Sequence, residues 1–441
     1  MDPATRMIVL DDDPTGIQTV HGCLLLTRWD AATMAAAFAD ACPFFFVLTN
    51  TRAYDGAEAR RIVAAVMDAV LAAGAPAGGP LVMVSRSDST LRSHFPIEID
   101  TIVGALAGAG TPPDAVFHVP AFIEAGRVTA GDEHFVIDGV RRVPASQTEY
   151  ARDAVFGYAT SHLPSWIERK TGGAVRAEQV RSIPLEMLRA ADASPLAAFL
   201  DGLAGGVYVV VNAETYDDLA CFARGVRAAL AAGKRFAFQA AASVVKALAG
   251  IPDRPLVGPE LVRGGGPGLV VVGSHVDRTT RQLAALLAEQ GVEGIEADVR
   301  AILDDAPAAL EAVRRRVEAV AHQGRTPCVY TSRRELRFSS ASSRLAAGRE
   351  VSRFLVRVTA SVGYHPAWLL AKGGITSHDV LVEAAGVRMA RVAGQILPGV
   401  PVVVTPADSR FGSIPLVIFP GNVGDDEAVR RAYRILQGDR P

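Results

Sequence analysis

The hydrophobic positions of this chain form short, continuous apolar runs separated by longer segments with helical spacing. The runs are rich in Val, Leu and Phe and lack the alternation of a half-exposed strand, which is typical of parallel sheets covered on both faces. The pattern predicts strands at Met7–Leu10, Phe44–Leu48, Leu81–Val84, Ala115–His118, Val207–Val211, Arg235–Phe238, Leu269–Val272, Cys328–Tyr330, Trp368–Leu370, Val402–Val404 and Leu416–Phe419.

Amphipathic segments between these runs predict helices at Ala57–Ala73, Asp217–Ala232, Arg278–Gln290 and Ala308–His322. Strands that alternate with helices indicate an α/β fold with mostly parallel sheets. Residues 120–180 carry many polar and aromatic residues with little strand signal, so we expect an insertion or a lid-like region there.

The length of 441 residues favours two domains. Residues 251–268 are rich in Pro and Gly, and an apolar run follows them directly. We therefore predict one domain over residues 1–255 and a second over residues 256–441.

Composition narrows the classes of function. Lys and Arg number 45 against 47 Asp and Glu, so the near balance gives no general electrostatic case for nucleic acid or anionic membranes. The longest apolar stretches are interrupted before a membrane-spanning length. Four widely spaced cysteines argue against disulfides and structural zinc, and together with a polar start they predict a cytoplasmic protein. These cysteines are Cys23, Cys42, Cys221 and Cys328.

Polar clusters follow the first four predicted strands, and the carboxyl ends of strands are where α/β sheets bind ligands. The clusters are Asp11–Gly16, Thr49–Arg52, Ser85–Arg92 and Glu124–Arg127. Arginine forks suit carboxylates, and aspartates accept hydrogen bonds from sugar hydroxyls or remove their protons. The candidates are therefore Arg86, Arg92 and Arg127 for a carboxylate, and Asp12, Asp13 and Asp88 for hydroxyls.

Each candidate also has a plainer interpretation. A single arginine is more often part of a surface ion pair, and Asp88 is as well suited to capping a helix that starts at Ser89. At least one residue of the aspartate triplet is expected to serve only the turn. The histidines show neither HxH nor HExxH spacing, which argues against a transition-metal centre, and His94 and His118 are secondary candidates for ligand contact.

The second half repeats a strand–glycine turn–helix pattern three times, at Gly273-Ser274, Lys372-Gly373-Gly374 and Gly421–Gly424. Glycines let backbone N–H groups approach a phosphate, and a helix N-terminus adds a favourable dipole. Neither GxxxxGK[ST] nor GxGxxG occurs at these turns. Three such turns favour phosphate binding at a site that is neither a Walker motif nor a standard Rossmann motif.

The blocks DDDPTG, SRSDSTLRSHFPIEID, VVGSHVDRTTRQL, AKGGITSHDV, GQILPGVPVVV and FPGNVGD occur in this order. Together they resemble the signature blocks of the four-carbon acid sugar kinases, over residues 7 to about 430. The resemblance implies a sugar-acid-binding N-terminal domain, a nucleotide-binding C-terminal domain and an active-site cleft between them. It also implies a transferase of carbohydrate metabolism that phosphorylates threonate, erythronate or a 3-oxo-tetronate with ATP and Mg²⁺. The chain departs from the usual ADDLTGA and TLRGH patterns at DDDPTG and TLRSH, and the former resembles a longer-chain subgroup.

Carried over by position, the resemblance implies ATP contacts at Ser274, Gly373, Gly374, Ile375, Thr376 and Gly421. It implies substrate contacts at Asp12, Arg86, Asp88 and Arg92, and our reading of the polar clusters adds Arg127. Asp12 is expected to orient or deprotonate the attacking hydroxyl, with Asp13 in support, while Asp379 either contacts the metal or caps its own helix. The expected partners are ATP and a small sugar acid.

Two other classes of function compete with this one. A non-catalytic sugar-acid sensor would share the two-lobed shape, and a nicotinamide-dependent oxidoreductase would act on the same acids. The second requires a glycine-rich turn with an acidic residue about 20 positions later, which no stretch matches well. The choice of acid, the hydroxyl that is phosphorylated and the metal ligands stay open, as does the oligomeric state, with a homodimer as one alternative.

Overall fold

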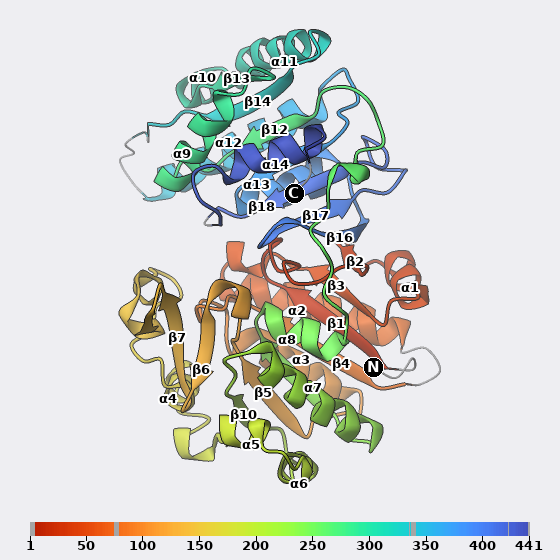
Figure 1. Ribbon diagram of the computed structural model, residues 1–441, viewed down its shortest axis with the longest axis vertical. Coiled ribbons are helices and arrows are strands. Elements are labelled where there is room, and N and C mark those ends of the chain that lie inside the picture. Colours follow the sequence, from red (N-terminus) through yellow and green to blue (C-terminus); the bar gives the residue numbers. More distant parts are fainter. Residues whose placement is uncertain (1–4, 75–78, 335, 337–340, 422, 440–441) are drawn as a thin grey trace. The chain divides into compact units, whose positions relative to one another are not determined.

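The structure is a computed structural model that describes residues 5–74, 79–334, 336, 341–421 and 423–439 (Figure 1). Its contacts divide the chain into two compact α/β units, with Asp253 ending the first and Arg254 beginning the second. In the described residues, no helix combines the length and the apolar character needed to cross a membrane.

The N-terminal unit is built on a parallel sheet with strand order β2-β3-β1-β4-β11-β5-β10-β9. Its strands are β1 (Arg6–Asp11), β2 (Leu24–Leu26), β3 (Phe44–Leu48), β4 (Leu81–Arg86), β5 (Ala115–Val119), β9 (Arg181–Ile183), β10 (Val207–Val211) and β11 (Phe236–Ala240). The six strands that we predict in this half all form.

Helices cover both faces of this sheet (Figure 1). Successive strand residues point to opposite faces. Val116 accordingly belongs to a cluster with Ile99 and Trp166, whereas the ring of Phe117 lies 5.1 Å from that of Phe222. The helices are α1 (Ala31–Ala39), α2 (Gly56–Ala73), α3 (Ile97–Gly108), α4 (Leu163–Lys170), α5 (Leu185–Arg189), α6 (Ser194–Asp201), α7 (Tyr216–Ala231) and α8 (Ala242–Ala249).

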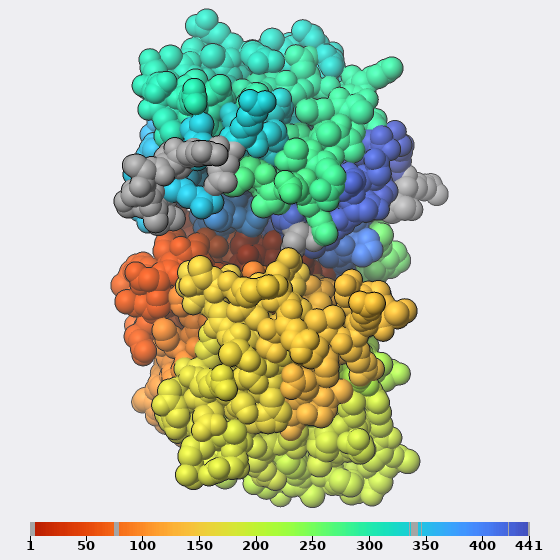
Figure 2. All heavy atoms as spheres, turned by 90° about the vertical axis from the view of Figure 1, so that its left-hand side faces the viewer, coloured from red at the N-terminus to blue at the C-terminus, as the bar shows by residue number. Residues whose placement is uncertain are grey.

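The expectation of little strand structure in residues 120–180 is wrong. This segment forms an antiparallel sheet of β6 (Arg127–Ala130), β7 (Glu133–Asp138) and β8 (Arg141–Pro144). Its strands are short and rich in charged residues, which hides them from a search for apolar runs. Figure 2 shows this segment, in amber and yellow, on one face of the N-terminal unit.

The C-terminal unit contains a mixed sheet with strand order β13-β14-β12-β15-β18-β17-β16, in which β17 is antiparallel to both its neighbours. The other pairs are parallel. Its strands are β12 (Leu269–Val272), β13 (Val292–Ala297), β14 (Thr326–Thr331), β15 (Leu369–Lys372), β16 (Met389–Leu397), β17 (Val400–Val404) and β18 (Pro415–Phe419).

The hydrophobic core of this unit includes Trp368, one of its largest fully buried side chains. Its indole packs on Gly268, where a Cβ atom would come within 2.2 Å of the ring, and lies 6.0 Å from the ring of Tyr433. The helices are α9 (Asp277–Leu287), α10 (Val299–Asp304), α11 (Ala306–His322), α12 (Ala341–Ala360), α13 (Gly374–Asp379), a π-helical turn (Val380–Ala384) and α14 (Ala428–Gln437).

Candidate active site

The polar clusters of the N-terminal unit start at the same level of the sheet. Asp11 is in register with Leu48 of β3 and Arg86 of β4, and Arg86 is in register with Ala240 of β11. The segments that follow β1, β3 and β4 therefore begin side by side. The cluster that follows β5 lies one strand further away than the order of the sequence suggests, because β11 separates β4 from β5.

Asp11 belongs to the base of the site. Its carboxylate is fully buried, accepts a hydrogen bond from Nη1 of Arg86 at 3.1 Å and leaves no room for a side chain at Gly16. A Cβ atom on Gly16 would lie 2.0 Å from Oδ1 of Asp11, so this position requires glycine. Burial raises the pKa of Asp11 to about 8, despite the opposing charge of Arg86.

Asp12 is held by two arginines. Nη2 and Nε of Arg52 donate to its two carboxylate oxygens at 2.5 and 3.1 Å, and Nη1 of Arg86 lies 3.5 Å from Oδ1. Its side chain is only 3% exposed. Burial raises the pKa of Asp12, while the charge of Arg52 opposes that shift. The carboxylate is thus fixed in orientation by a bidentate guanidinium contact.

Asp13 is the most accessible carboxylate of the triplet, with 21% of its side chain exposed. Its Oδ1 accepts hydrogen bonds from the backbone N–H and the hydroxyl of Thr15 at 2.8 and 2.5 Å. Oδ2 lies 3.4 Å from Nη1 of Arg52. Burial acts to raise the pKa of Asp13, but Arg52 and Thr15 outweigh it, and the pKa is lowered. Asp13 is therefore ionised at neutral pH.

The predicted carboxylate-binding arginines have different surroundings. Arg86 is 5% exposed and pairs with Asp11 and Asp12, deep in the sheet edge. Arg92 is 25% exposed and donates from Nε to Asp88 at 2.7 Å. Arg127, at the start of β6, donates from Nη1 to the backbone oxygen of Ala125.

The interpretation of Asp88 as a helix cap is wrong, because residues 87–96 contain turns and irregular backbone but no helix, and α3 begins only at Ile97. Asp88 instead accepts hydrogen bonds from Thr90 and Arg92. Burial acts to raise the pKa of Asp88, but the charges of Arg52 and Arg92 outweigh it and lower the pKa.

Glu98 is a site residue that the sequence did not single out. It lies on α3, is 3% exposed and accepts hydrogen bonds from the hydroxyls of Thr51 and, at 3.4 Å, of Ser85. Burial raises the pKa of Glu98 to about 7, and the nearby charge of Asp12 adds to the shift. Arg52 was also missed as a contact of Asp12, although its segment was recognised as a polar cluster.

The two candidate histidines have structural surroundings. Nε2 of His94 lies 3.0 Å from the backbone oxygen of Tyr54, and the imidazole of His118 stacks on Trp166 at 5.0 Å. Burial lowers the pKa of His118 to about 3, so it is neutral at physiological pH. Its place against Trp166 is that of a core residue.

The three glycine turns of the C-terminal unit are also neighbours. Val272 is in register with Lys372, and Lys372 with Phe419, so the turns after β12, β15 and β18 begin at one level. At the first turn, a Cβ atom on Gly273 would lie 2.1 Å from Oγ1 of Thr376. At the second, Gly373 has a φ of 112°, a conformation that favours glycine.

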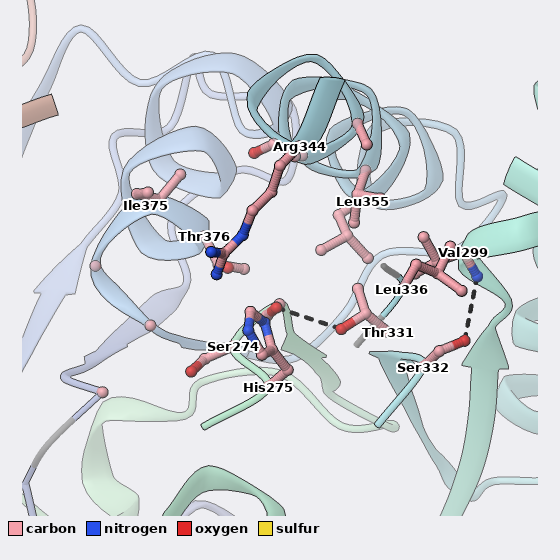
Figure 3. A pocket seen from close by; sticks show the side chains of 18 of the residues that line it. Ser274, His275, Val299, Thr331, Ser332, Leu336, Arg344, Leu355, Ile375 and Thr376 are labelled. Carbon is pink, nitrogen blue, oxygen red and sulfur yellow. Dashed lines mark hydrogen bonds between the residues drawn. The ribbon is translucent and has the colours of Figure 1, made fainter. Parts of the chain in front are cut away.

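These turns line a cavity of about 430 Å³ (Figure 3). The opposite wall comes from α12, where Ala347, Val351 and Leu355 are apolar, and the side chain of Arg344 extends into the space toward Thr376 (Figure 3). Every predicted ATP contact lines this cavity, namely Ser274, Gly373, Gly374, Ile375, Thr376 and Gly421. Asn422, in the third turn, lies outside the described residues.

A buried lysine and a partly buried aspartate lie close to these turns. Lys372 is 1% exposed, and its Nζ donates to the backbone oxygen of Pro420 at 2.5 Å. Burial lowers the pKa of Lys372 to about 7. Asp379 ends α13 and accepts a hydrogen bond from Ser352, a cavity residue, so it does not cap the start of its helix.

Comparisons with known proteins match the two halves of the chain to two different domain families. A family model described as a sugar-binding N-terminal domain matches residues 7–248, and one described as a nucleotide-binding C-terminal domain matches residues 269–429. The chain is 28% identical over 366 residues to the D-threonate kinase of Cupriavidus necator. The matched region covers 81% of this chain and 80% of that protein. The chain belongs to the four-carbon acid sugar kinase family.

Solved structures show the same fold. A protein of Salmonella typhimurium LT2 matches with a TM-score of 0.72 and 19% identity, covering 97% of this chain and 99% of that one. The Haemophilus influenzae protein HI1011 matches with a TM-score of 0.67 and 16% identity, covering 97% of this chain and 100% of that one. The four-carbon acid sugar kinase family thus accounts for both the α/β architecture and the two kinds of domain in this chain.

Proposed function

We propose that this protein transfers the terminal phosphoryl group of ATP to a hydroxyl group of a four-carbon sugar acid of the threonate, erythronate or 3-oxo-tetronate type. The observation that carries the proposal is the set of three neighbouring glycine turns around one cavity, because such turns bring backbone N–H groups close to phosphates. The similarity to a D-threonate kinase supports the class of acceptor.

The residues of the cavity fit a nucleotide. A volume of about 430 Å³ lies within the range of small-molecule sites. The glycine turns, with Ser274 and Thr376, would receive the phosphates, and the apolar wall of α12 offers a surface for the base. The absence of a side chain at Gly273 keeps Thr376 close to the first turn.

Mg²⁺, which the resemblance to the sugar-acid kinases implies, would neutralise phosphate charge when it is bound. The described residues contain no cluster of three or more His, Cys, Asp or Glu side chains suited to a metal. Such a cluster is not required, because Mg²⁺ at kinase sites is held by phosphates and water with one or two carboxylates. Asp379 remains a candidate for one of these.

In the N-terminal unit, Asp12 and Asp13 would receive the substrate hydroxyl. Phosphoryl transfer requires mainly orientation and charge stabilisation from the protein. Asp13 is ionised and more exposed, so it is the carboxylate that an incoming hydroxyl reaches first, whereas Asp12 is fixed by Arg52. We propose that Asp13 orients the hydroxyl or accepts its proton and that Asp12 maintains the position of this segment.

The experiment is an assay of ADP release with a panel of D- and L-threonate, D- and L-erythronate and their 3-oxo counterparts. We expect turnover with at least one acid and little release without an acceptor. Saturable binding of an acid with no ADP release, in the presence of ATP and Mg²⁺, would instead support a sensor that binds sugar acids without catalysis.

A further inference from the structure

Tyr150 contacts two of the predicted substrate arginines at once. It lies on a short 3-10 helix, Glu149–Arg152, just after the β6–β8 sheet. Cζ of Arg92 lies 5.0 Å from the centre of its ring, and Cζ of Arg127 lies 5.8 Å from the same point. Nη2 of Arg127 also donates to the tyrosine hydroxyl at 3.4 Å. Both guanidinium groups are therefore placed by one aromatic side chain.

The two arginines differ in their counter-charges. Arg92 pairs with Asp88 at 2.7 Å and lies 3.8 Å from Asp153. Arg127 has no carboxylate within 4.0 Å among the described residues of the chain, and its Nε is buried without a hydrogen-bond partner. A partly buried cation with an unused donor is costly unless an anion completes it. The geometry at Arg127 therefore suits an anionic ligand.

The segment that carries Tyr150 is attached to the turn that carries Asp88 and Arg92, two of the predicted substrate contacts. The hydroxyl of Tyr158 donates to the backbone oxygen of Thr90 at 2.8 Å, and Nε2 of His134 lies 2.8 Å from that of Ser89. These bonds join the segment to the turn that contains Asp88 and Arg92. The position of the Tyr150 ring is consequently set by the fold of the N-terminal unit, which favours a fixed wall of the site over a free lid.

We propose that Tyr150 is a positioning and specificity-determining residue, which presents Arg92 and Arg127 as a pair that binds the carboxylate of the sugar acid. The inference rests on the proposed function and adds the means by which the site distinguishes an acid from a neutral polyol. Arg92 also has a carboxylate partner, but its side chain is 25% exposed, whereas that of Arg86 is 5% exposed and lies between Asp11 and Asp12. Arg92 is therefore the more accessible of the two to a ligand. The Tyr150 hydroxyl accepts a hydrogen bond from Arg127 alone, whereas the ring contacts both arginines.

The test compares Tyr150→Leu, which removes the ring, with Tyr150→Phe, which removes only the hydroxyl. Tyr54→Leu is the matched control, because that side chain is 46% exposed. The ligand, called tetronate below, is the acid of the panel that wild type binds most tightly. Its affinity is measured by calorimetry without ATP, and KM values are measured for tetronate and for ATP. We expect Tyr150→Leu to weaken tetronate binding by about five- to thirtyfold, as loss of two cation–π contacts implies, with KM for ATP unchanged.

A purely structural role of Tyr150 would leave unchanged the preference of the site for a charged ligand over a neutral one. Wild type should bind tetronate more tightly than erythritol, the neutral tetritol, and this preference should shrink in Tyr150→Leu and in Arg127→Gln but not in Tyr150→Phe. Unchanged tetronate affinity in both Tyr150→Leu and Arg127→Gln would overturn the inference, as would a wild type that binds no sugar acid. If wild type binds tetronate without turnover and Tyr150→Leu weakens that binding, the kinase proposal fails and the inference stands.

Discussion

Arg52 binds both carboxylate oxygens of Asp12, with Nη2 2.5 Å from Oδ1 and Nε 3.1 Å from Oδ2. The backbone N–H of Arg52 also donates to the carbonyl of Asp12 at 3.3 Å. The segment after β3 thus fixes the segment after β1 through side-chain and backbone contacts. Three adjacent aspartates are tolerated at this strand end because Arg52 and Arg86 pair with them, and because burial raises the pKa of Asp11 to about 8 and so reduces its charge at neutral pH.

Replacement of Arg52 by lysine should lower kcat more than it changes KM for ATP. Lysine keeps the charge but cannot make the planar, bidentate contact, so Asp12 would lose its fixed orientation. We expect kcat to fall by about 10- to 100-fold, in line with the loss of one strong charge-assisted hydrogen bond. Steady-state kinetics measure this.

Arg61→Lys is the control for that variant, because Arg61 forms an exposed ion pair with Glu58 on α2 of the same unit. It should retain wild-type rates. If Arg52→Lys were equally active, the contact between Arg52 and Asp12 would have no part in turnover.

The two candidate catalytic carboxylates should respond differently to amidation. Asp13→Asn should lower kcat by at least about 100-fold, as removal of an acid–base group does, with little change in melting temperature. Asp12→Asn should lower both kcat and melting temperature, because it unbalances the buried pairs with Arg52 and Arg86. Near-normal kcat in Asp13→Asn would return the catalytic assignment to Asp12.

Glu98 should make the protein less stable as the pH rises. Its pKa is raised from 4.5 to about 7, so the folded protein holds this proton after the unfolded chain has lost it. The folded state therefore loses stability between about pH 4.5 and 7. Glu98→Gln removes this loss. As the pH rises through that interval, its free energy of unfolding should increase relative to that of wild type by up to about 1.4 kcal/mol per pH unit.

Urea unfolding at several pH values measures the difference between Glu98→Gln and wild type. Glu186→Gln on the exposed side of α5 serves as the control and should follow wild type. Parallel stability curves for wild type and Glu98→Gln across this interval would contradict the raised pKa.

Gly273→Ala should weaken ATP binding specifically. The added methyl group would lie 2.1 Å from Oγ1 of Thr376, so the second glycine turn must move. Overpacking of this kind costs about 1–3 kcal/mol, which corresponds to a rise in KM for ATP of about fivefold or more. Gly265→Ala has no atom within 4 Å of the added group and is the control. A normal KM for ATP in Gly273→Ala would show that this turn does not contribute to ATP binding.

Much of the fold could be predicted from the sequence because most of its strands are buried on both faces. Phe44–Leu48 and Val207–Val211 are continuous apolar runs, and their predicted bounds match the structure. β13 and β7 were missed because they contain charged residues, Glu293 and Glu296 in β13 and Glu133 in β7. A search for continuous apolar runs does not detect strands that are only partly buried.

The candidate site was less accessible to sequence reasoning. The order of the strands in the sheet cannot be read from their order along the chain, so the interposition of β11 between β4 and β5 was not foreseen. Pairings over long separations, such as Arg52 with Asp12 and Tyr150 with Arg92, arise only from tertiary packing. The glycine turns were recognisable because glycine itself is the local signal.

Phosphoryl transfer from ATP to a sugar acid is tested most directly by phosphorus NMR of the purified protein incubated with ATP, Mg²⁺ and the sugar acid that gives the most ADP. We expect a new phosphomonoester resonance that grows in equal amount to ADP, with no corresponding rise in inorganic phosphate. ADP accompanied only by inorganic phosphate, or no loss of ATP with any acid of the panel, would contradict it.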